Sequence, residues 1–259
     1  AELCATVEAE GAALLKNENN ALPLASGAKV SLFGHGSVDL MYGGTGSGSV
    51  DTSKAPNFKQ ALEDQGIQVN STLWDLYSSD DMMKNYSRIT PAAISDTLEA
   101  NTQYAVNEAP WSKLSSAESS FADYGDAAIV VFSRSGGEGA DLPSGENGTN
   151  DSWIKGQEGD GNYLALSAEE KELLQNLKTL KDNGTFKKII VLINSSNAIE
   201  MDFLNPEICG EDYGIDSAMW IGDVGQTGIN GVAQLLAGEV TPSGSLVDSY
   251  PVSYTHLTL

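Results

Sequence analysis

The chain has 259 residues, 41% of them hydrophobic, and its 36 acidic and 14 basic side chains give a formal net charge of -22. The length and the apolar content are sufficient for a globular core. A charge this negative repels phosphate backbones and anionic lipid headgroups, so nucleic acids and membrane surfaces are excluded as expected partners.

The residue types that commonly bind metals are few and scattered. The two cysteines, Cys4 and Cys209, and the two histidines, His35 and His256, lie far apart in the sequence. They form neither a disulfide framework nor a zinc or haem pattern. We therefore expect no metal and no cofactor.

The beginning of the chain predicts neither a secretion signal nor a membrane anchor. It lacks a basic start followed by a long apolar stretch, and no run reaches the roughly 18 apolar residues of a membrane span. We expect a soluble protein, located in the bacterial cytoplasm.

Periodicity and end signals predict alternating helices and strands. Ser167 and Glu170 have the spacing of a capping box, and Gly66 and Gly238 stand where helices should end. In chain order the pattern predicts a helix up to about Lys16, a strand over 29–33, a helix over 55–66, a strand over 67–70, a mainly helical stretch over 71–122, a strand over 126–134, a helix over 168–180, strands over 187–195 and 217–221, and a helix over 228–238.

The predicted strands are continuously apolar, which is typical of parallel strands buried on both faces. Their alternation with helices predicts an α/β fold, with an open, mostly parallel sheet and helices on both faces. We predict one such domain over residues 1–251. Residues 252–259, "VSYTHLTL", have no core pattern and form a tail of doubtful origin.

Two glycine-rich loops follow predicted strands, where open α/β sheets bind ligands. The loop over 34–50 contains "GGTGSG", but its glycine spacing fits neither a dinucleotide fingerprint nor a P-loop. The loop over 133–143, "SRSGGEGADLP", places Glu138 between two glycines, which leave its carboxyl group little shielded. Alternatively, both loops are ordinary exposed connections.

Several segments together resemble one enzyme family. The segments are "AEGAALLKNENNALPL", "KVSLFGHGS", "GGTGSGSV", "VVFSRSGGEGADLP", "LSAEEKELLQNL", "KKIIVLINSS" and "GQTGINGVAQLLAGEVTPSGSLVDSYP". In this order they resemble the α/β sandwich domain of the family-three glycoside hydrolases, the β-glucosidase group. The resemblance covers about residues 3 to 251.

The resemblance implies a catalytic residue and several substrate contacts. Glu138 stands where the family has its general acid/base glutamate. Arg134 and Asp141 would orient it or bind sugar hydroxyls, or else anchor the loop. Thr45 and Ser47 match the family's glycine-rich loop near the sugar pocket. The substrate would be a β-glucoside or a short β-linked oligosaccharide.

The chain departs from the family pattern at three places. The "SDW"-type motif of the aspartate nucleophile is absent, and a barrel of about 250 residues does not fit beside the sandwich. Leu142 replaces the usual arginine after "EGAD", and "GQTG" at 225–228 replaces a "GQEGG"-like turn.

These departures leave two functions open. The first is the sandwich domain of a retaining exo-β-glycosidase, a β-glucosidase, whose nucleophile lies on a barrel domain absent from this chain. Such a chain would be inactive alone. The second is a stand-alone carbohydrate-binding or interaction module without catalysis.

Overall fold

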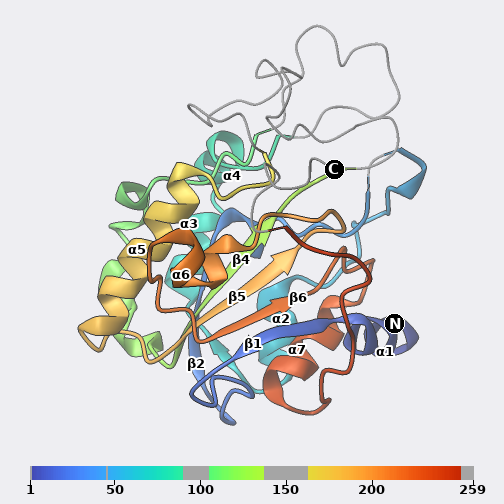
Figure 1. The fold of residues 1–259 in the computed structure, drawn as a ribbon, viewed down its shortest axis with the longest axis horizontal. Coiled ribbons are helices and arrows are strands. Elements are labelled where there is room, and N and C mark those ends of the chain that lie inside the picture. Colours follow the sequence, from blue (N-terminus) through green and yellow to red (C-terminus); the bar gives the residue numbers. More distant parts are fainter. Residues whose placement is uncertain (1, 45, 90–104, 137–162, 252–259) are drawn as a thin grey trace, which may run out of the picture.

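The computed structural model describes residues 2–44, 46–89, 105–136 and 163–251 (Figure 1). These residues form a six-stranded sheet with the order β1-β6-β5-β4-β2-β3. The strands are β1 (Ala13–Asn17), β2 (Lys29–Phe33), β3 (Gln68–Val69), β4 (Ala127–Ser133), β5 (Ile189–Asn194) and β6 (Ser217–Trp220). Neighbouring strands from β3 to β6 run parallel, and β1 is antiparallel to β6. The predicted α/β fold is confirmed.

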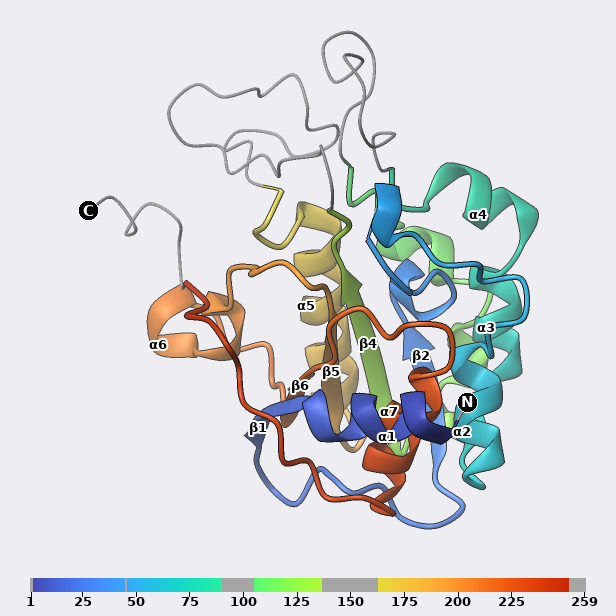
Figure 2. The same cartoon turned by 90° about the vertical axis from the view of Figure 1, so that its right-hand side faces the viewer.

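Helices cover both faces of the sheet (Figures 1 and 2). They are α1 (Glu2–Gly11), α2 (Phe58–Asp64), α3 (Ser71–Tyr77), α4 (Asp80–Asn85), α5 (Ala168–Asp182), α6 (Pro206–Cys209) and α7 (Ile229–Ala237). Alternate residues of β4 supply the two cores. Ile129 packs in a cluster with Val232 of α7, and Val130 packs in a cluster with Leu174 of α5. Every residue of β4 and β5 is buried, because each central strand is covered on both faces.

The capping box predicted for the longest helix is confirmed. The Ser167 hydroxyl accepts from the Glu170 backbone amide at 3.2 Å, and Glu170 Oε2 accepts from the Ser167 amide at 2.9 Å. Glu170 is only 1% exposed, although it is a charged residue of the first turn. Glu170 is also buried because it pairs with Arg134 in the candidate site described below.

The predicted helix up to Lys16 is wrong in its second half. The helix ends at Gly11, and Ala13–Asn17 instead forms the edge strand β1 beside β6. Leu3 and Val7 lie at helical spacing in the sequence, but they do not form the buried face of this helix, since they are 75% and 60% exposed. The buried face of α1 consists of the small residues Ala5 and Ala9.

Small residues allow α1 to approach α7 closely. A Cβ atom added to Gly231 of α7 would collide with the carbonyl oxygen of Ala5 and lie 3.1 Å from the Ala9 amide nitrogen. At Gly11, the same addition would meet nothing within 4 Å. The contact between these helices therefore depends on the absence of a side chain at Gly231.

We predict that Gly231→Ala lowers the free energy of unfolding by about 1–3 kcal/mol, because well-packed interfaces tolerate an added methyl group poorly. Urea denaturation followed by circular dichroism measures this change. The matched control Gly11→Ala should change the stability by less than about 1 kcal/mol. Equal effects of the two substitutions would contradict the close approach of α1 and α7.

Candidate functional site

The candidate site lies at the edge where the parallel strands end. This carboxyl edge comprises the residues that follow β2, β4, β5 and β6. Of the predicted site residues, Arg134 follows β4, and Ser47 is exposed in a short 3-10 helix over Gly46–Gly48. Glu138, Asp141 and Thr45 lie outside the described residues. The structure therefore describes residues that flank Glu138 in the sequence but not Glu138 itself.

Arg134 is completely buried, and its five N–H groups are all used inside the protein. Nη1 and Nη2 donate to the two carboxylate oxygens of Glu170 at 2.8 and 2.7 Å. The guanidinium group also donates to the carbonyl oxygens of Tyr163, Ala165 and Ser133. Both Arg134 and Glu170 have side chains at most 1% exposed. Arg134 was predicted to orient Glu138, to bind sugar hydroxyls or to anchor the loop; these contacts favour anchoring and leave no N–H group for a sugar.

Glu170 stabilises the charged form of Arg134. Burial alone would lower the pKa of Arg134, but the negative charge of Glu170 and its hydrogen bonds raise that pKa above its ordinary value, with smaller contributions from Tyr163 and Glu108. Arg134 and Glu170 thus form a charged, bidentate pair inside the protein.

The Arg134 contacts join two stretches that are far apart in sequence. Arg134 directly follows β4, whereas its partners Tyr163, Ala165 and Glu170 come about 30 residues later. The Ser135 amide also donates to the Tyr163 hydroxyl at 3.1 Å. Buried polar contacts therefore connect the described residues on the two sides of residues 137–162, the stretch of sequence that contains Glu138.

A second buried pair follows β2. Glu108 Oε2 accepts from the His35 amide and lies 2.8 Å from His35 Nδ1, and Glu108 Oε1 accepts from the Ala109 amide. The two side chains are 4% and 1% exposed. Nearby, burial and then the charge of Glu108 raise the pKa of Tyr77 well above its ordinary value, so this phenol stays neutral and accepts from the Gly34 amide.

A third pair connects β4 with the glycine-rich loop. Arg88 donates to the Ser133 hydroxyl at 2.7 Å and to the Asp39 carbonyl at 2.8 Å, and its Nη2 lies 3.1 Å from Asp39 Oδ1. A hollow of about 270 Å³ lies beside this contact, lined by Asp39, Leu40, Met41, Tyr42, Gly43, Gly44, Ser49, Val50, Thr52 and Arg88. The hollow is therefore built in part from the loop predicted to contact sugar.

Sequence reasoning missed Arg88, His35 and Glu108. The sequence contains only two arginines, Arg88 and Arg134, and both bind Ser133 at the end of β4. Because arginine is so rare in this chain, Arg88 could have been considered a candidate site residue from the sequence alone. No local pattern linked His35 with Glu108, because 73 residues separate them.

Buried polar atoms without partners gather at the same edge. Among the described residues, Glu8 Oε1, His35 Nε2, Asn197 Nδ2 and Asp223 Oδ1 are buried and have no hydrogen-bond partner. His35, Asn197 and Asp223 follow β2, β5 and β6, respectively, and the charge of Asp223 acts on Glu8. Native proteins satisfy almost all buried polar groups, so this edge is where further hydrogen-bonding partners are expected.

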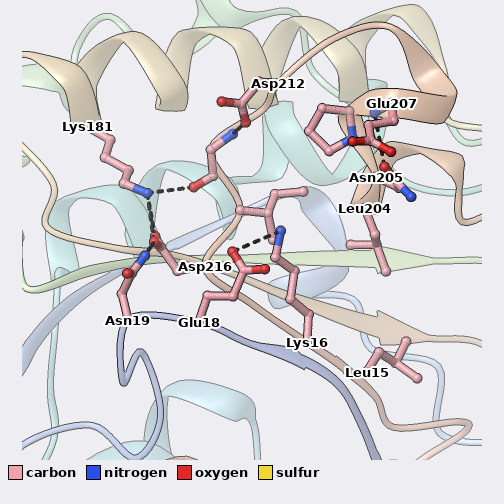
Figure 3. Close-up of a pocket in the computed structure, with 13 residues that line it drawn as sticks. Leu15, Lys16, Glu18, Asn19, Lys181, Leu204, Asn205, Glu207, Asp212 and Asp216 are labelled. Atoms are coloured by element: carbon pink, nitrogen blue, oxygen red, sulfur yellow. Dashed lines mark hydrogen bonds and ion pairs between the residues drawn. The ribbon is translucent and has the colours of Figure 1, made fainter.

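The larger pocket lies at a different place. It has a volume of about 790 Å³ and lies where β6 begins and β1 ends (Figure 3). Lys181 Nζ donates to both oxygens of Asp216 and to the Gly214 carbonyl, and Asn19 also donates to Asp216. Neither Arg134 nor Ser47, the two predicted site residues that the structure describes, lines this pocket. We therefore assign the candidate site to the carboxyl edge and not to the larger pocket.

Across the described ranges, no three His, Cys, Asp or Glu side chains gather closely enough to hold a metal ion. In the same ranges, every helix is too short or too polar to cross a bilayer.

The fold and the buried pairs define an α/β domain with a polar site at the carboxyl ends of its parallel strands. The family model of the glycosyl hydrolase family 3 C-terminal domain matches residues 12–259. The chain therefore belongs to this family, as the sequence resemblance predicted.

Known relatives of the chain are β-glucosidases. It is 30% identical over 257 residues to the β-glucosidase of Ruminococcus albus, covering 98% of this chain and 23% of that protein. It is also 30% identical to β-glucosidase A of Butyrivibrio fibrisolvens, covering 96% of this chain and 28% of the relative. The chain thus spans about a quarter of the length of these relatives.

Solved structures show the same domain. A β-glucosidase from Paenibacillus barengoltzii matches with a TM-score of 0.72 and 29% identity, over 96% of this chain and 24% of that one. β-Glucosidase 3B from Thermotoga neapolitana, solved in complex with α-D-glucose, matches with a TM-score of 0.70 and 25% identity, over 98% of this chain and 31% of that one.

We predict that Arg134→Met lowers the free energy of unfolding by about 3–5 kcal/mol, because it leaves the Glu170 carboxylate buried without its partner. Chemical denaturation measures the loss. Lys178→Met on α5 is the matched control, since Lys178 pairs with the exposed Asp182, and it should cost at most about 1 kcal/mol. Adding Glu170→Gln to Arg134→Met should recover part of the loss. A cost for Arg134→Met as small as that of the control would show that the buried pair does not anchor the edge.

Proposed function

We propose that this chain is the acid/base-bearing part of a retaining exo-β-glycosidase that acts on β-glucosides or short β-linked oligosaccharides. The family membership and the β-glucosidase relatives support the enzyme class. The aspartate nucleophile would lie on a barrel domain, and the relatives are long enough to contain one besides this domain.

The observation that supports Glu138 as the acid/base residue is the set of buried contacts between the described residues before and after its segment. This segment follows β4 at the carboxyl edge, and Arg134 binds the residues on its far side. A catalytic group needs to be held within a fraction of an ångström of its productive position. Arg134, which is buried and uses all its N–H groups, provides a fixed point shortly before Glu138 in the sequence.

The proposed chemistry has two steps. Retaining enzymes place two carboxyl groups about 5 to 5.5 Å apart. Glu138 would protonate the leaving glycosidic oxygen while the nucleophile on the barrel attacks the anomeric carbon. As a base, Glu138 would then remove a proton from the water that releases the sugar. Asp141, Thr45 and Ser47 would bind sugar hydroxyls beside it.

The test replaces the matching domain of the Ruminococcus albus β-glucosidase with this chain. We expect the isolated chain to hydrolyse no chromogenic β-glucoside and the chimeric enzyme to hydrolyse it. Glu138→Gln in the chimera should lower kcat by about 10² to 10⁴-fold for a poor leaving group, because general acid catalysis contributes about that much. A strongly activated leaving group departs without being protonated. With such a substrate, the rate of the first step should fall far less in Glu138→Gln.

The matched control is Glu146→Gln, in the same segment. It should leave kcat within about threefold of the parent chimera, since it removes a carboxyl group without a proposed catalytic role. If Glu138→Gln lowers kcat no more than Glu146→Gln does, the acid/base assignment is wrong. Saturable glucose binding by the isolated chain in calorimetry, with an inactive chimera, would instead favour a stand-alone carbohydrate-binding module.

A further inference from the structure

The side chain of Asn194, the last residue of β5, binds two loops at the carboxyl edge. Its Oδ1 accepts from the Met41 amide at 2.6 Å, and its Nδ2 donates to the Met41 carbonyl oxygen at 3.0 Å. Nδ2 also donates to the Gly222 carbonyl oxygen at 2.6 Å, in the loop after β6. Asn194 is completely buried. One buried side chain thus holds both backbone groups of Met41 and joins its loop to the loop after β6.

Met41 depends on these bonds because it lies in neither a helix nor a strand, although it is buried. A buried backbone group without a partner costs about as much free energy as a lost hydrogen bond. Inside a sheet, a neighbouring strand supplies the partners of such a residue. Here the amide group of Asn194 does so, and the Val224 amide adds a second donor to the Met41 carbonyl oxygen, at 3.1 Å.

The three bonds require an asparagine at position 194. One amide group must accept from an N–H group and donate to two carbonyl oxygens. An aspartate has the same shape, but its ionised carboxylate has no hydrogen to donate. A glutamine has the same amide but one more methylene group, which a well-packed interior accommodates poorly.

Met41 lies two residues before the glycine-rich stretch over 43–48, which contains Thr45 and Ser47. Met41 also lines the hollow of about 270 Å³, together with Arg88. Glycines have no side chains that could fix their own backbone. The place of this stretch therefore depends on the anchored residues beside it.

We propose that Asn194 is a positioning residue for substrate binding, which acts by fixing Met41 and hence the glycine-rich stretch over 43–48. Its role in sugar binding rests on the proposed function, in which Thr45 and Ser47 bind sugar hydroxyls. The anchoring of Met41 does not depend on that function.

Amide hydrogen exchange of the chain, followed by NMR, tests the anchoring. In the parent chain the Met41 amide should exchange at least about a hundredfold more slowly than in an unstructured chain, because it is buried and bonded. In Asn194→Ala, the exchange rate of Met41 relative to the amides in the middle of β4 should rise by about tenfold or more. The ratio is used because a general loss of stability speeds the exchange of all these amides together.

The matched control is Asn70→Ala. Asn70 is also completely buried, and its side chain also makes three hydrogen bonds, but these go to Ser31, Ser120 and Leu73. The exchange ratio of Met41 should therefore stay within about threefold of the parent value.

Kinetics of the chimeric enzyme test the role in substrate binding. Asn194→Ala should raise KM for a chromogenic β-glucoside by about tenfold and change kcat by less than about threefold, as expected for a lost binding interaction. A merely structural defect lowers the concentration of active enzyme, which lowers the apparent kcat but not KM. Asn70→Ala should therefore leave KM within about twofold of the parent chimera.

The two measurements separate a failure of the positioning role from a failure of the proposed function. An inactive parent chimera would contradict the proposed function, and the role of Asn194 in sugar binding would fall with it. An active chimera with the same KM in Asn194→Ala and Asn70→Ala would overturn the positioning role alone. Rapid exchange of the Met41 amide in the parent chain would overturn the anchoring, even if neither variant folds.

Discussion

The buried pair of Arg134 and Glu170 is the interaction on which the carboxyl edge depends. A fully desolvated guanidinium group is tolerated only where all its N–H groups are bonded and its charge is balanced. Here Glu170 provides the balancing charge and also completes the cap of α5. One carboxylate thus connects the end of β4, the start of α5 and the residues before it. Removing either partner affects all three.

The two edges of the sheet differ in how well their polar groups are satisfied. Where β6 begins, Asp216 accepts from Lys181, Asn19 and the Ile189 amide, and its site is complete within the domain. At the carboxyl edge, Arg134 uses all its N–H groups, whereas buried atoms of His35 and Asn197 have no partner. This contrast, more than pocket size, distinguishes a structural edge from one suited to a ligand or a second domain.

The sequence predicted the parts of the fold that depend on local chemistry. The apolar runs of β4 and β5 and the Ser167 capping box could be recognised because each pattern has one physical explanation. The start of the chain was misread since Leu3 and Val7 have helical spacing but face outward. Glycine at 231 lets the smaller residues of α1 be buried instead.

The contacts between distant residues could not be predicted. The family resemblance identified Glu138 and Arg134 as candidates, but spacing alone does not show that Arg134 binds residues about 30 positions later. The pair of His35 with Glu108 likewise arises only when the sheet brings loops together. Such pairs depend on topology, and a single sequence has no local signal for them.

The electrostatics of the carboxyl edge suit the chemistry proposed for it. A general acid works near neutral pH only if its pKa is raised, by burial or by negative neighbours. Glu8 and Asp223 at this edge both have raised pKa values, mainly because burial desolvates their carboxyl groups, although the charge of Arg88 opposes the rise at Asp223. For Glu8, burial and then the charge of Asp223 raise the pKa to about 8. Burial thus favours the protonated form of these two carboxyl groups, which is the form that a general acid needs.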